Sequence, residues 1–201
     1  GAQQPLRMLD RARTESVVIG AETIVVENTS YRCYEDFCEL LREVLSAASI
    51  HEIAGFTRIG LRYINEIRIP DVVAPSDWEG LVHPALLAGG GLCHQDVSVQ
   101  RLSGEIEYAT STRHSVVMRY GSFQGRVVNL EGPLRTRTSE SGPAFLIDLD
   151  SYWEDPARIE LPEFSIQEIM STTSELRAPI HELFEVAITD ELRKRFREEP
   201  T

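Results

Sequence analysis

The stretch Phe56-Thr57-Arg58-Ile59-Gly60-Leu61-Arg62-Tyr63-Ile64-Asn65-Glu66-Ile67-Arg68-Ile69-Pro70 decides how the rest of the chain is interpreted. Its apolar and polar residues alternate with a period of two, which is typical of a β-strand that buries one face. The apolar side carries Ile59, Leu61, Tyr63, Ile67 and Ile69, and the polar side carries Arg58, Gly60, Arg62, Glu66 and Arg68. Asn65 interrupts the apolar side. The sequence therefore predicts a strand at 56–70 whose second face bears arginines.

An arginine-bearing sheet face is either a binding surface or one half of a ladder of ion pairs. Asp148 and Asp150 alternate with apolar residues in a second predicted strand, so both aspartates leave that strand on one side. If the two strands are neighbours, Arg58 or Arg62 faces Asp148 or Asp150, and opposite charges across strands are a normal stabilising pair. We favour this structural ladder, while planar arginines could also bind phosphate or carboxylate groups.

The alternative is a site for a small anionic ligand. Arg58, Arg62, Asn65 and His181 would then converge on a cavity between the sheet and a C-terminal helix. For Asn65 we favour a buried polar anchor, and for His181 a half-buried helix histidine whose hydrogen bonds are satisfied.

The remaining pattern predicts an α+β fold in which helices cover an antiparallel sheet. We expect one domain, 1–201, built as two similar strand-then-helix halves at about 1–70 and 71–201. Ser165 and Glu168 form a capping box at the start of a long terminal helix, which Pro179 should kink. Further strands are predicted at 5–13, 16–27 (a hairpin), 95–109, 114–120 and 144–151, helices from 34, at 76–87 and at 165–197, and a loop at 121–143.

Composition limits the partners. The chain has 201 residues, a hydrophobic fraction of 42% and a net charge of −12. Such an acidic protein is a poor general ligand for nucleic acid, which requires a basic surface. A protein partner or a homo-oligomer is the expected association.

Cofactors, metals and membranes are not expected. Asp148-x-Asp150 is a weak metal motif because no third ligand accompanies it at a useful spacing. The sequence contains no P-loop, dinucleotide fingerprint or nucleophile elbow, so it indicates no reaction. Cys33, Cys38 and Cys93 have neither disulfide-framework nor zinc spacing, which favours a reducing cytoplasm. No apolar run is long enough to cross a bilayer.

The run Thr57–Asn65 resembles the signature of an uncharacterised, sporadically distributed bacterial protein family. Three further segments resemble the same family: Asn28-Thr29-Ser30-Tyr31 with Phe37; Phe145–Asp150; and His181-Glu182-x-Phe184-Glu185 followed by Ile188-Thr189-Asp190 and Phe196. The resemblance implies a natural N-terminal strand and helix ahead of this chain. It also implies an accessory locus such as defence, a toxin–antitoxin pair or specialised biosynthesis.

The sequence thus leads to two hypotheses about function. The first is a non-enzymatic binding or interaction protein. The second is a domain that binds, or acts on, a small anionic ligand through Arg58, Arg62, Asn65 and His181.

Overall fold

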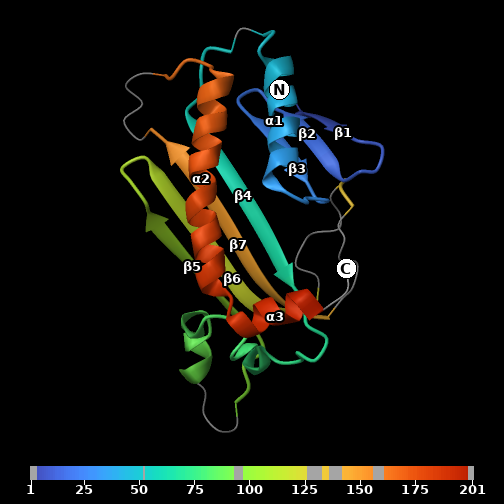
Figure 1. The fold of residues 1–201 in the computed structure, drawn as a ribbon, viewed down its shortest axis with the longest axis vertical. Coiled ribbons are helices and arrows are strands. Elements are labelled where there is room, and N and C mark those ends of the chain that lie inside the picture. Colours follow the sequence, from blue (N-terminus) through green and yellow to red (C-terminus); the bar gives the residue numbers. More distant parts are fainter. Residues whose placement is uncertain are drawn as a thin grey trace. The chain divides into compact units, whose positions relative to one another are not determined.

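The computed structural model describes residues 4–51, 53–92, 97–125, 133–135, 142–155 and 161–198. These residues form two antiparallel sheets together with helices, which confirms the α+β fold class (Figure 1). The chain divides into two compact units, one of residues 1–55, 128–140 and 162–170, the other of residues 56–127, 141–161 and 171–201. The single domain and the two similar halves stay predictions.

The first unit contains a three-stranded sheet and a helix. The strands are β1 (Leu6–Leu9), β2 (Glu15–Ile19) and β3 (Ile24–Asn28), in the order β1-β2-β3, and the helix is α1 (Tyr34–Ala48). The predicted hairpin at 16–27 matches β2 and β3, which pair from Glu15↔Asn28 to Ile19↔Ile24.

The predicted strand at 5–13 is too long, because Asp10 turns the chain. Its carboxylate accepts hydrogen bonds from the backbone N–H groups of Ala12 (2.9 Å), Thr14 (2.7 Å) and Glu15 (2.8 Å). The bond from Glu15 contributes most to lowering the pKa of Asp10 below its usual value. A local side-chain acceptor therefore ends β1 at Leu9.

The second unit contains a four-stranded antiparallel sheet. Its strands are β4 (Arg58–Ile67), β5 (Leu102–Ala109), β6 (His114–Gly125) and β7 (Gly142–Glu154), in the order β4-β7-β6-β5. The longest strand, β7, lies between β4 and β6, so β4 and β5 are the outer strands of this sheet (Figure 1).

Both β6 and β7 are longer than the sequence predicted. The glycine- and serine-rich stretch from 121 was expected to be a loop, yet residues 121–125 continue β6 by pairing with residues 142–146 of β7. A Cβ at Gly121 would collide with the carbonyl oxygen of Leu102, so this glycine marks a close approach between strands. The rest of the predicted loop lies outside the described residues except for 133–135. The strand predicted at 95–109 begins at Leu102, and residues 95–96 are likewise outside the described part.

One face of the four-stranded sheet is apolar. Phe145, Ile147 and Leu149 of β7 are completely buried, and the indole of Trp78 packs against the ring of Phe145 at a centroid distance of 5.2 Å. Val116 and Met118 of β6 are buried beside them, in register with Ser151 and Leu149. This face is therefore the core of the second unit.

Short 3-10 segments replace the single helix predicted at 76–87. They are η1 (Pro75–Trp78), η2 (Pro84–Leu86) and η3 (Ala88–Leu92). The Asp77 carboxylate accepts bonds from the backbone N–H groups of Val73 and Ala74, both at 2.9 Å. The bond from Ala74, followed by that from Val73, lowers the pKa of Asp77 below its usual value.

The predicted terminal helix is divided into α2 (Ile166–Ala187) and α3 (Asp190–Glu198). Ile188 forms a β-bridge with Val82, and the Thr189 backbone N–H donates to the Leu81 carbonyl at 3.0 Å. The Thr189 hydroxyl then accepts from the backbone N–H of Leu192 and caps α3. The helix is interrupted because the backbone at 188–189 pairs with the segment 81–82.

Pro179 lies inside α2, which continues on both sides of it, and the predicted kink stays a prediction. No helix within the described ranges has the length and apolar character needed to span a membrane.

Candidate functional site

The face of the four-stranded sheet opposite the apolar core carries most of the predicted site residues. We call it the charged face and define it by eight of its outward residues: Arg58, Arg62, Glu105, Glu107, Arg119, Asp148, Asp150 and Tyr152. Strand register places Arg62, Asp150, Val117 and Glu107 in one row, and Ile64, Asp148, Arg119 and Glu105 in the next.

The strongest interaction on this face joins Arg62 to Asp148. The arginine donates from Nε to Oδ1 at 2.7 Å and from Nη2 to Oδ2 at 2.6 Å, so the contact is bidentate. The Asp148 side chain is 4% exposed and that of Arg62 is 50% exposed. The hydrogen bonds to Asp148 raise the pKa of Arg62 above its usual value. Arg62 thus lies half in solvent but holds a buried carboxylate.

Arg58 makes a looser contact. Its guanidinium lies 3.6 Å from the Asp150 carboxylate and 4.5 Å from the centre of the Tyr152 ring. Gly60 lies between the two charged residues: a Cβ there would be 3.7 Å from Arg58 Nη1 and 3.8 Å from Asp150 Oδ1.

The other half of the charged face continues the pattern. Arg119 of β6 pairs with Glu105 of β5 at 2.7 Å. The Tyr152 hydroxyl donates to the Glu107 carboxylate at 2.8 Å, and this bond raises the pKa of Tyr152 above 10.0. Glu107 thus accepts from a neutral hydroxyl, whereas Glu105 faces a cation.

Apart from Glu66, which lies at the end of β4 and pairs with Arg68, the sign of the charge alternates from strand to strand across this face. β4 presents Arg58 and Arg62, β7 presents Asp148 and Asp150, and β6 presents Arg119. The outer strand β5 then presents Glu105 and Glu107. Each of the three arginines therefore has an acidic partner on the same face, and the outer strand β5 carries acidic side chains.

The four residues predicted to hold an anionic ligand do not share one surface. Arg58 and Arg62 leave β4 on the charged face, whereas Asn65 leaves on the apolar side. The Asn65 side chain donates to the Ile147 carbonyl at 3.1 Å. His181 is exposed on α2, next to the buried Ile180, so the half-buried position predicted for it is wrong. The alternation of β4 already implied that Arg62 and Asn65 point in opposite directions.

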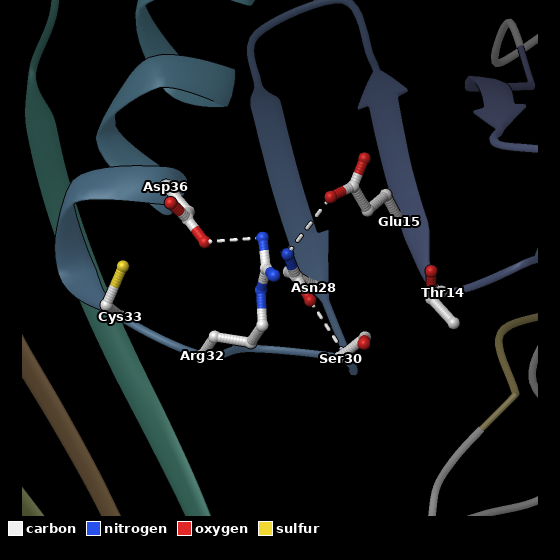
Figure 2. Close-up of a pocket in the computed structure, with 7 residues that line it drawn as sticks. All are labelled: Thr14, Glu15, Asn28, Ser30, Arg32, Cys33 and Asp36. Carbon is white, nitrogen blue, oxygen red and sulfur yellow. Dashed lines mark hydrogen bonds and ion pairs between the residues drawn. The ribbon is translucent and has the colours of Figure 1, made fainter.

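A polar pocket lies elsewhere, in the first unit, with a volume of about 280 Å³ (Figure 2). Arg32 and Asp36 pair across it at 3.0 Å, and the Asn28 amide donates to Glu15 at 3.1 Å. Cys33 lies at the start of α1 and makes no side-chain capping bond. The remaining lining residues are Thr14 and Ser30. In Figure 2 Arg32 points toward Asp36 and Asn28 toward Glu15, and none of the predicted ligand residues lines this pocket.

Sequence reasoning missed Glu105, Glu107, Arg119 and Tyr152. Glu105-Ile106-Glu107 alternates inside a predicted strand, so the acidic side of β5 was visible as a pattern. Its relation to Arg119 and Tyr152 was not, because it depends on which strands are neighbours.

Comparisons with known proteins assign no family: no family model, curated protein or solved structure matches the chain. The resemblance to the sporadic bacterial family therefore stays a prediction. Among the residues that the structure describes, no group of three or more His, Cys, Asp or Glu is arranged to hold a metal ion.

Proposed function

We propose that the protein is a non-enzymatic interaction protein that binds a basic protein partner through the charged face. The observation that carries the proposal is the alternation of charge across β4, β7, β6 and β5, which ends on Glu105 and Glu107. A basic partner at β5 meets acidic side chains, and complementary charge favours both encounter and selectivity.

The overall charge of −12 supports the same class of partner. Arg58 and Arg62 already face Asp150 and Asp148, whose side chains are 22% and 4% exposed, so an anionic ligand would have to compete with these carboxylates. Glu105 also has a partner, Arg119, but its side chain is 59% exposed, which leaves it accessible to a second cation. This disfavours the anionic-ligand alternative. The cytoplasmic location and the accessory locus stay predictions.

The proposal is tested on the full chain by measuring its affinity for a fluorescently labelled peptide that contains four arginines. Fluorescence anisotropy reports the binding. The double variant Glu105→Gln, Glu107→Gln should bind about tenfold more weakly, since each lost charge pair is worth up to about 1 kcal/mol. The control Glu39→Gln, Glu43→Gln removes the same charge from exposed positions on α1 and should bind as the parent does.

Equal weakening by both double variants would show that only net charge matters, and absence of binding by the parent would refute the proposal. Self-association is the alternative protein contact, and light scattering coupled to size-exclusion chromatography detects it directly.

A further inference from the structure

The outer strand β5 has one paired side and one side without a strand. Its eight residues pair with β6 from Leu102↔Ser122 to Ala109↔Ser115, and β5 is last in the order β4-β7-β6-β5. Within the described ranges no further strand pairs with it. Every second backbone N–H and C=O of an edge strand points away from its neighbour, which leaves these groups able to pair with an added strand.

We propose that a segment of the basic partner binds in extended form along β5 and adds a fifth strand to this sheet. The inference rests on the proposed function and specifies how the partner is held. In this mode the main-chain hydrogen bonds hold the segment, while alternate side chains decide which segment is chosen.

The charged face defines one set of side chains in the added strand. Glu105 is 59% exposed and Glu107 is also exposed, and they lie two residues apart on the same side of β5. Arg62 of β4 pairs with Asp148 of β7, and Arg119 of β6 pairs with Glu105 of β5, so this sheet places opposite charges on neighbouring strands. A fifth strand that continues the alternation carries arginine or lysine at every second position.

The apolar face defines the other set. Ile106 is 36% exposed at the edge, although its register partner Met118 is buried. A Cβ at Gly104 would lie 2.5 Å from the Cζ and hydroxyl oxygen of Tyr120, so this tyrosine extends across the β5 backbone toward the edge. Apolar residues at the remaining positions would cover Ile106 and Tyr120. The segment thus alternates basic and apolar residues.

The charge of β5 also distinguishes a basic partner from a second copy of the same edge. Two β5 strands placed side by side would bring Glu105 and Glu107 against the same residues, and like charges directly opposite each other destabilise strand pairs. Charged residues on an edge strand protect it against pairing with its own copies, and a basic segment does not meet this barrier at Glu105 and Glu107.

Peptides of matched charge test the inference on the full chain. The probe is a capped octapeptide that alternates arginine and valine, and the control has the same residues with the four arginines in one block. Two further forms of the alternating peptide carry N-methyl groups, one on the valines and one on the arginines. In an added strand the N–H groups of alternate residues point to the same side, so either the valine or the arginine N–H groups, but not both, are directed at β5.

We expect the alternating peptide to bind more tightly than the block peptide. One N-methylated form should lose about tenfold or more in affinity, since several hydrogen bonds are removed together, while the other keeps most of it. Amide hydrogen exchange followed by NMR should show new protection at alternate residues of β5 and not in α1.

Equal affinity for all four peptides, without protection of β5, would refute strand addition and leave the proposed function standing. If none of the four peptides bound, both proposals would be refuted. A dimer in which the β5 amides are already protected without peptide would assign the edge to a second copy and overturn the inference.

Discussion

The two faces of the four-stranded sheet differ although they are built from the same strands. On β7, Ile147 and Leu149 point into the apolar core and are fully buried, while Asp148 and Asp150 between them point to the charged face. Burial of apolar area stabilises the fold without regard to direction. The bidentate contact of Arg62 with Asp148 requires one geometry. One face therefore supplies most of the stability, while the other favours one pairing of the strands over its alternatives.

The largest expected effect comes from truncating one leucine on each face of β7. Leu149 is fully buried, whereas Leu146 lies on the opposite face and is half-buried. Leu149→Ala should lower the free energy of unfolding by about 3 kcal/mol, through lost burial and the cavity that remains. Leu146→Ala should lower it by about 1 kcal/mol. Denaturant unfolding measures both, and equal losses would contradict the division between the faces.

A smaller effect is expected from the ion pairs of the charged face. Asp148→Asn leaves a poorer acceptor for Arg62 and should lower the free energy of unfolding by about 1–2 kcal/mol. The half-exposed position of Arg62 limits the loss, because water can solvate the guanidinium.

The matched control for this pair is Asp150→Asn. Its contact with Arg58 is longer, at 3.6 Å, so the expected loss is below about 0.5 kcal/mol. If Asp150→Asn proves the more damaging variant in the same unfolding measurement, the ranking of the two pairs is wrong.

The smallest effect concerns the pKa of Tyr152. Glu107→Gln removes the carboxylate that accepts from the Tyr152 hydroxyl, so this pKa should fall toward 10.0. NMR titration of ring-labelled tyrosine measures the change, with the other tyrosines as internal controls. An unchanged pKa would show that the carboxylate is not the cause.

The pH dependence of stability follows from the same bond. The pKa of Tyr152 is higher in the folded protein than in the unfolded chain, so the folded state holds the proton more tightly. The stabilisation is fully present below pH 10.0 and is lost as the pH rises through the folded-state pKa. Glu107→Gln should reduce this alkaline dependence, which thermal unfolding at several alkaline pH values would detect.

The sequence by itself determined the local elements whose pattern repeats over many residues. The period-two alternation of 58–67 predicted β4, the spacing of apolar residues predicted α1, and turn residues between β-branched arms predicted the β2–β3 hairpin. These features depend on neighbours along the chain, so the sequence displays them directly.

Only the tertiary structure decided how distant segments meet. Residues 121–125 are polar and glycine-rich, yet they extend β6 because β7 provides hydrogen-bonding partners. The terminal helix breaks at 188–189 because segment 81–82 binds its backbone. Arg62 stands beside Asp150 in register but bonds to Asp148, two residues away. Each outcome depends on pairing between residues far apart in sequence, which no local pattern encodes.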